Sequence, residues 1–331
     1  MPGVHKTRLI GCLVVPILLV FGIAALILYL GVAFDVFAPA PRVSTAQFAT
    51  ADTVLLAHAD FEAPRLARLL EDVAGGYASS AAYVLPYECS LVLDVTHGDP
   101  PSRRMTLAVS PRHLGPLTRS RTREFLSNLR VPGIDSWTTT GLEIERGAMV
   151  LRGAGLCEVP PSPPPDTTDL TEMELQGGHL LEVALRNPGG ALPAVLAPFL
   201  RGPESGGDRP GPEPHDYTAL FEGISSGCLT LDLMSGEASD DQPDPSDTAL
   251  VAIDLQYGND AAAESALIAL RAIRDGIVEW ATEREVEVTG GLQRQGSRLL
   301  GGLHIAGFQA PLKRALEDAF STEEDLSNAP D

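Results

Sequence analysis

Lysine is almost absent from this chain, and acidic residues far outnumber basic ones. Lys6 and Lys313 are the only lysines, and the 24 basic residues face 44 acidic ones, which gives a net charge of −20. Proteins that bind phosphate backbones need clustered Lys and Arg, and anionic lipid headgroups repel an acidic surface. The composition therefore argues against nucleic acid as a partner.

Aromatic residues and cysteines are also scarce. Aromatics make up 5% of the chain, so its cores must be built from Leu, Val, Ile and Ala. Of the four cysteines, Cys89, Cys157 and Cys228 follow the N-terminal apolar segment. In an oxidising compartment one pair of them can form a disulfide, and the sequence does not choose the pair. Alternatively, all three are small buried hydrophobic residues.

The chain lacks the spacings with which proteins hold metals. It contains no HExxH and no Cys-x2-Cys sequence, and none of its seven histidines stands at ligand spacing. Packed or solvated histidines explain all seven. We expect neither a cofactor nor a metal ion.

One acidic segment offers a weak alternative to that expectation. Asp240, Asp241, Asp244 and Asp247 lie close together, and calcium prefers several carboxylate oxygens on a flexible loop. The spacing and the glycine of an EF-hand loop are missing, and two prolines stiffen the segment. A solvated loop is the expected structure.

Residues Leu9–Phe34 form a run of 26 residues without a charge. About 20 apolar residues cross a bilayer as a helix, so this run predicts a single-pass anchor. Ala38-Pro39-Ala40 resembles a signal-peptide cleavage site and Cys12 a lipoprotein cysteine. However, the apolar run is longer than the core of a cleavable signal peptide. A lipoprotein signal needs an apolar core before its cysteine, whereas the few residues before the box that ends at Cys12 are polar or mixed.

The flanking charges predict the orientation of this anchor. Lys6 and Arg8 precede it, so the N-terminus should stay in the cytoplasm. The remainder, with a charge of about −22, is expected outside the inner membrane of a bacterium, in the periplasm or beyond it.

A glycine-containing pattern, T-G-x5-G-x2-[VL]-L-x-G, occurs at residues 140–153 and again at 289–302. Gly147 and Gly296 stand where each segment should turn, because glycine accepts the positive φ of a tight turn. Each copy therefore predicts a β-hairpin, and the recurrence indicates an internal repeat.

Three further pairs of strand-like segments recur in the same order. They are 55–59 with 180–184, 90–94 with 228–232, and 105–109 with 250–255. The first segment of each copy is followed by apolar residues at helical spacing, between Leu66 and Val73 and between Leu192 and Phe199. Insertions at 201–214 and 236–247 lengthen the second copy.

Two longer helices complete the expected repeat. Ser110-Pro111 is a typical helix start; Pro116 should interrupt this helix, which then resumes to about Arg130. In the second copy Asp260 can cap a helix that runs to about Glu285. Its expected buried face consists of Ala266, Leu270, Ile273, Ile277 and Trp280.

These patterns predict an α+β fold with an N-terminal transmembrane helix and two tandem βαββαββ repeats. The sheets should be mostly antiparallel, with the helices packed on one face. The expected divisions are a cytoplasmic N-terminus (1–8), the anchor (9–34), a linker (35–50), repeat 1 (51–159), a Pro-rich spacer (160–173), repeat 2 (174–320) and an acidic disordered tail (321–331).

Gly223-Ile-Ser225-Ser-Gly227 matches the G-x-S-x-G pattern of serine hydrolases, and Asp232 and His304 follow it. That pattern works on a turn that leads from a strand into a helix, whereas here a helix-like stretch precedes it and a strand follows. Ser225 is therefore only a weak candidate for a catalytic residue.

The preferred functional hypothesis is a membrane-anchored, non-enzymatic protein of the cell envelope that binds a protein partner or serves as a structural component. A carrier of lipid or a small amphiphile, with an apolar cleft, is the alternative. A serine hydrolase that uses Ser225 is a third, weaker hypothesis.

Overall fold

The computed structural model describes slightly more than half of the chain. The described residues are 39–62, 66, 85–96, 102–115, 118–120, 123, 138–139, 141–156, 175, 177–193, 195–196, 218–234, 247–311 and 313–314. The expected anchor 9–34, the spacer 160–173 and the tail 321–331 lie outside them, and most of both insertions does too. No helix among the described residues is long and apolar enough to cross a membrane.

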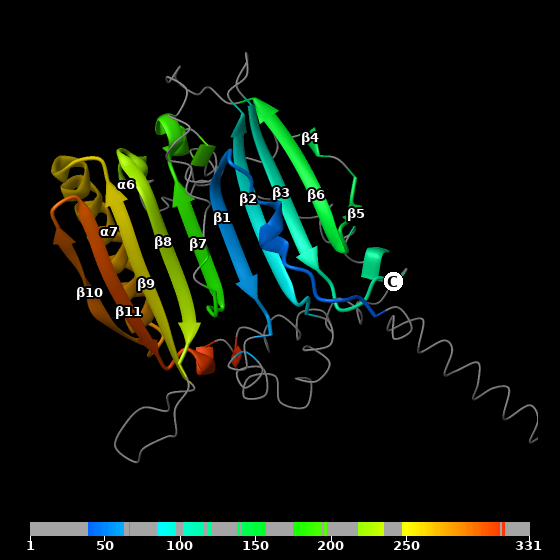
Figure 1. Ribbon diagram of the computed structural model, residues 1–331. Coiled ribbons are helices and arrows are strands. Elements are labelled where there is room, and N and C mark those ends of the chain that lie inside the picture. Colours follow the sequence, from blue (N-terminus) through cyan, green and yellow to red (C-terminus); the bar gives the residue numbers. More distant parts are fainter. Residues whose placement is uncertain are drawn as a thin grey trace, which may run out of the picture. The chain divides into compact units, whose positions relative to one another are not determined.

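Eleven strands form one antiparallel sheet (Figure 1). They are β1 (Thr53–Asp60), β2 (Glu88–Thr96), β3 (Ser102–Ser110), β4 (Thr138–Thr139), β5 (Glu143–Glu145), β6 (Ala148–Leu156), β7 (Leu181–Arg186), β8 (Ile224–Leu233), β9 (Thr248–Tyr257), β10 (Glu287–Gln295) and β11 (Arg298–Ala306). The spatial order is β10-β11-β9-β8-β7-β1-β2-β3-β6-β4, and β5 also pairs with β6.

The expected fold class was wrong, because the strands do not form the sheets of two tandem α+β repeats. Strand β1 pairs with β7 along five residues, from Leu55 opposite Leu185 to Ala59 opposite Leu181. That pairing satisfies the inner edges of both groups of strands and merges them into one sheet. The described residues also contain fewer helices than expected.

The strands follow the same order on each side of the β1–β7 pair. One side reads β1, β2, β3 and β6, and the other reads β7, β8, β9 and β11. We call these the first and second halves of the sheet. The boundaries proposed for the two repeats stay a prediction.

The two predicted hairpin turns are confirmed. Arg146 and Gly147, with φ of 52° and 86°, connect β5 to β6, and Gly296, with φ of 61°, begins the two-residue turn between β10 and β11. Positive φ at these positions gives the turn a twist that matches the strands it joins.

One face of the sheet packs against helices. Helix α7 (Asp260–Thr282) lies behind β9, β10 and β11 in Figure 1. Its buried residues form one apolar cluster with the sheet, and α6 (Thr218–Phe221) packs against this cluster. The predicted helical segment after β7 contributes Leu192, Val195 and Leu196, all buried. This cluster also contains apolar residues of the first half, so one core runs beneath both halves.

Helix α7 differs from its prediction at both ends. The cap is Asn259, whose side chain accepts a hydrogen bond from the backbone N–H of Ala262, and the last helical residue is Thr282. Ala266 and Leu270 are buried as expected, but Trp280 at the far end is 53% exposed. The predicted apolar face is thus buried only over its N-terminal part.

A short segment covers the opposite face of the first half. It runs from Arg42 to Ala49, includes the 3-10 turn η1 (Thr45–Phe48), and is called the strap below. Its Phe48 belongs to one buried apolar cluster with Leu56, Val92, Ala108 and Val150 from four adjacent strands. In Figure 1 the strap crosses in front of β2 and β3.

The described residues 39–41 and 111–115 belong to a different unit from the one that contains the sheet. Among these residues, Pro39 and His113 form an antiparallel bridge, and the N–H of Ala40 donates to the carbonyl of Arg112. The expected helix start at Ser110-Pro111 was wrong, because Ser110 is the last residue of β3 and 111–115 are not helical, whereas 118–120 and 123, after Pro116, are helical as predicted.

Candidate functional site

Polar side chains of the three adjacent strands β7, β1 and β2 form a row on the face of the sheet that carries the strap. His58 of β1 lies opposite Glu182 of β7 on one side and opposite Ser90 of β2 on the other. Residues that pair directly in an antiparallel sheet point to the same face. Glu182 is 1% exposed and Ser90 is fully buried, so this row needs internal hydrogen-bond partners.

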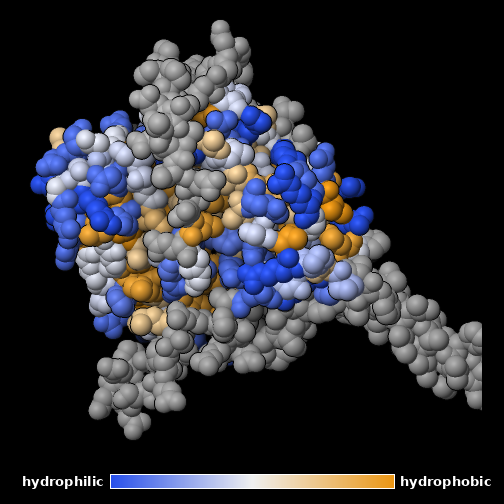
Figure 2. Space-filling model, viewed as in Figure 1, coloured by the Kyte–Doolittle hydropathy of each residue, from blue (hydrophilic) through white to orange (hydrophobic). Residues whose placement is uncertain are grey.

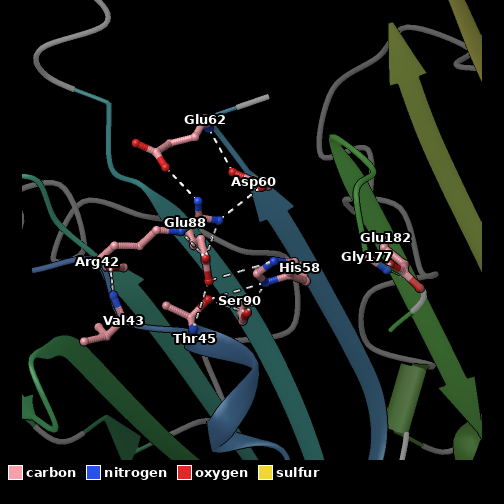
Figure 3. Close-up of polar contacts among 11 residues, drawn as sticks. Arg42, Val43, Thr45, His58, Asp60, Glu62, Glu88, Ser90, Gly177 and Glu182 are labelled. Carbon is pink, nitrogen blue, oxygen red and sulfur yellow. Dashed lines mark hydrogen bonds and ion pairs between the residues drawn. The ribbon is translucent and has the colours of Figure 1, made fainter. Parts of the chain in front are cut away.

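Ser90 and His58 stand at the distance of a nucleophile and its base. The Ser90 hydroxyl lies 2.9 Å from Nδ1 of His58 and 2.7 Å from Oγ1 of Thr45 in the strap (Figure 3). A serine–histidine pair of this kind can activate a nucleophile when a substrate reaches it. Here Ser90 and Thr45 are both fully buried, so the strap closes the hydroxyl off. The contact fits a structural hydrogen-bond network.

Glu88 connects the strap to this row. Its carboxylate accepts hydrogen bonds from the Arg42 side chain at 2.7 Å and from the backbone N–H of Thr45 at 3.2 Å. Nε2 of His58 lies 4.0 Å from the same carboxylate, which is 7% exposed. A buried carboxylate with these partners joins strap and sheet through charge-assisted bonds.

Arg42 also reaches two further carboxylates, Asp60 at 3.2 Å and Glu62 at 2.6 Å. The hydrogen bond to Glu88 contributes most to raising the pKa of Arg42, and Asp60 and Glu62 add to it. One guanidinium thus binds three acidic side chains and fixes the start of the strap on the sheet (Figure 3).

A second histidine–carboxylate pair lies at the beginning of β7. Nδ1 of His179 is 2.5 Å from Oδ2 of Asp232, and the other oxygen of Asp232 accepts from the backbone N–H of Leu180 at 3.2 Å. An aspartate that holds a histidine in this way orients the ring, as in many catalytic sites. No serine or cysteine is recorded at hydrogen-bond distance from His179 among the described residues.

The residues of the sequence-based hydrolase hypothesis do not come together. Ser225 lies in β8 beside a shift in register, and its carbonyl accepts from the N–H of Asn187. Asp232 lies seven residues farther along the same strand, which corresponds to about 23 Å. His304 stands in register with Leu250 and, through it, with Asp232, so it lies at that distant end as well.

Of the weak calcium candidates, Asp240, Asp241 and Asp244 lie outside the described residues. Asp247 is described, and its carboxylate accepts a hydrogen bond from the backbone N–H of Gln309 at 2.7 Å. Within the described part of the chain, no group of three or more His, Cys, Asp or Glu side chains is arranged to hold a metal ion.

Cys89 and Cys228 are free thiols on strands β2 and β8. Strands β7 and β1 lie between β8 and β2, so the two thiols are too far apart to form a disulfide. Burial, with help from Glu182, raises the pKa of Cys228 to about 11, which keeps that thiol protonated. Cys157 lies outside the described residues, so its pairing stays open.

Comparison with protein-family models, with curated proteins and with solved structures gives no match in any of the three. The candidate site therefore rests on its geometry alone.

Sequence reasoning missed the network of Thr45, His58, Glu88, Ser90 and Arg42. These residues have no motif spacing, and His58 was expected to be packed or solvated without a defined partner. One signal was available: a β1–β2 pairing, once assumed, sets His58 opposite Ser90 and Asp60 opposite Glu88. The strap, in contrast, carries no pattern that predicts where it packs.

Proposed function

We propose that this chain is a single-pass, membrane-anchored protein of the bacterial envelope, and that its extracytoplasmic sheet binds a protein partner without catalysing a reaction. The proposed anchor is Leu9–Phe34, because 26 uncharged residues suffice to span a bilayer. The acidic composition argues for a partner other than nucleic acid.

The open face of the second half is the observation that carries this proposal. The strap covers the first half of this face, whereas Leu250, Ala252, Leu300 and Gly302 on the second half are only half-buried. Figure 2 shows apolar and weakly polar residues gathered over β8, β9 and β11. An apolar area with polar groups around it is typical of a protein-binding surface.

Charged side chains border this area. Asp254 and Arg298 form an ion pair at one end of the strands, and Asp232 and His179 form a hydrogen-bonded pair at the opposite end. Their mutual pairing leaves the middle of the face uncharged, which suits a partner with a flat, weakly polar surface.

The buried polar network gives further support. The hydroxyl of Ser90 and the carboxylate of Glu88 are occupied by bonds that attach the strap, and both are shielded from solvent. These groups therefore stabilise the fold, and the open face remains the region available to a partner.

The test is crosslinking and affinity capture of the full-length protein from its native membranes, with matched variants. Ala252→Arg places a long cation on the open face, and Ala261→Arg places the same side chain on the exposed start of α7. We expect the wild type and Ala261→Arg to capture the same stoichiometric protein, and Ala252→Arg to lose it while its melting temperature changes little.

Equal capture by Ala252→Arg would show that the open face is not the binding surface. A turnover activity that a single substitution abolishes would overturn the non-enzymatic assignment. Enrichment of a lipid without a protein would favour the carrier of small amphiphiles.

A further inference from the structure

One end of the sheet is distinguished by the attachment of the strap. At this end β1, β3, β8 and β11 finish and β2, β6, β7, β9 and β10 begin. Arg42 binds here to Asp60, the last residue of β1, and to Glu88, the first residue of β2. We call it the strap end.

Exposed apolar side chains gather at the strap end. Four large hydrophobic residues of the described chain are exposed: Trp280 at 53%, Ile144 at 45%, Met234 at 37% and Ile268 at 62%. Met234 follows the last residue of β8, and Ile144 lies two residues before the turn that leads into β6. Ile268 alone lies elsewhere, in the N-terminal half of α7.

Trp280 belongs to the last turn of α7, which reaches the strap end. The next elements confirm this position, since the N–H of Val286 donates to the carbonyl of Ala281, and Glu287 pairs with Ala306 at the end of β11. The guanidinium of Arg284 stacks 4.6 Å from the centre of the Trp280 ring. Tryptophan with a neighbouring arginine is a combination found at membrane interfaces.

With residues 9–34 in a bilayer, as proposed above, the length of the chain limits how far the strap end can lie from that membrane. Only seven residues, 35–41, separate the end of the proposed anchor from Arg42. Seven extended residues span at most about 25 Å, which is less than the length of one nine-residue strand. Arg42 is fixed to the strap end by three carboxylates, so the tether acts on that end of the sheet.

We infer that the strap end rests on the bilayer that holds the anchor, with Trp280 and Met234 in contact with the lipid headgroup region. This inference rests on the anchor of the proposed function. The acidic neighbours Glu283, Glu285 and Glu287 favour contact with an uncharged, zwitterionic lipid surface, because anionic headgroups would repel them.

The test uses the full-length protein reconstituted into phosphatidylcholine vesicles, with and without brominated acyl chains that quench nearby tryptophan. Trp137→Phe leaves Trp280 as the only tryptophan. The matched control is Trp137→Phe/Trp280→Phe/Ile268→Trp, whose reporter lies on the same helix about 18 Å away along its axis. Trp137→Phe/Trp280→Phe/Met234→Trp gives a second reporter at the strap end.

We expect brominated lipid to remove much of the fluorescence at positions 280 and 234 and little at position 268. Equal quenching at all three positions, or none at 280 and 234, would overturn the inference. Resistance of the protein to alkaline extraction from the vesicles tests the anchor separately. An extractable protein would refute the anchor, and a resistant but unquenched protein would refute only the contact of the strap end.

Discussion

The two halves of the sheet present the same face to different surroundings. In the first half the strap buries this face, with Leu56, Val92 and Ser90 at 1% exposure or less. In the second half Leu250, Ala252 and Leu300 are half-buried. The two halves share their strand order, but the eight-residue strap turns the face of the first half into a buried core and leaves the face of the second half at the surface. Strand order alone therefore does not decide what a sheet face can bind.

An aspartate of the second strand illustrates both the likeness and the difference. Asp94 accepts hydrogen bonds from Thr50 and Thr53 at the start of β1, and Asp232 accepts from His179 and Leu180 just before β7. Each carboxylate ties its strand to the entry of the neighbouring strand. Asp94 is buried more deeply than Asp232, so the free-energy cost of keeping its carboxylate ionised is higher.

Removal of the strap's main apolar anchor should have the largest effect. We expect Phe48→Ala to lower the free energy of unfolding by about 3 kcal/mol, because the ring fills the space above Leu56 and Val92. Leu300→Ala on the open half should cost less than half as much. Urea denaturation of both variants measures the difference, and equal losses would show that the strap does not distinguish the halves.

Ser90→Ala tests the buried polar row beneath the strap. Loss of the hydroxyl leaves His58 and Thr45 without a shared partner, so we expect a loss of about 1–2 kcal/mol. Ser226→Ala, at an exposed position on β8, is the matched control and should be close to neutral. An equally small effect of Ser90→Ala would mean that water or rotation of the side chains replaces the lost bonds.

Asp94→Asn tests the cost of the buried charge. Burial raises the pKa of Asp94 above its ordinary value of 3.8, although bonds from Thr53 and Thr50 oppose the rise. The folded state then binds the proton more tightly than the unfolded chain, so this contribution to stability is present in acid and is lost as pH rises through the folded pKa. The asparagine variant should therefore gain stability relative to wild type between pH 4 and pH 7, as measured by urea midpoints.

Asp254→Asn on the open half should show the opposite dependence on pH, and the smallest effect. The hydrogen bond from Arg298 lowers the pKa of Asp254, so its contribution is present above pH 3.8 and disappears as pH falls through the folded pKa. The side chain is 42% exposed, which limits the loss at pH 7 to about 0.5 kcal/mol. Urea midpoints of Asp94→Asn and Asp254→Asn relative to wild type should change with pH in opposite directions. The same direction for both variants would contradict the comparison.

Local features of the fold were predictable because neighbouring residues determine them. Gly147 and Gly296 marked their turns, the segment after β7 is helical at Leu192 and Val195, and α7 began within one residue of its predicted start. The helix expected at Ser110-Pro111 failed because the pairing of β3 with β2 extends through Ser110. At Ser110 the hydrogen bonds between β2 and β3 therefore outweigh the local signal for a helix start.

The site was less accessible to prediction than the fold. Ser225 stood in a recognisable motif, but its strand places it far from Asp232. Ser90 and His58 stood in none, yet they lie 2.9 Å apart because β1 and β2 pair in one particular register. A register fixes which side chains meet, and a single-residue slip would turn each of them to the other face.

The sequence by itself determined the hairpin turns, the segments that form strands and the α7 helix, because turn residues and apolar periodicity act over a few positions. Only the tertiary structure decided that β1 pairs with β7 and that the strap covers the first half. The β1–β7 pairing joins segments more than 100 residues apart, and the strap is held by side chains from β1, β2 and β3. Such contacts form when unpaired strand edges and apolar faces must be buried together, and no local pattern encodes which ones will meet.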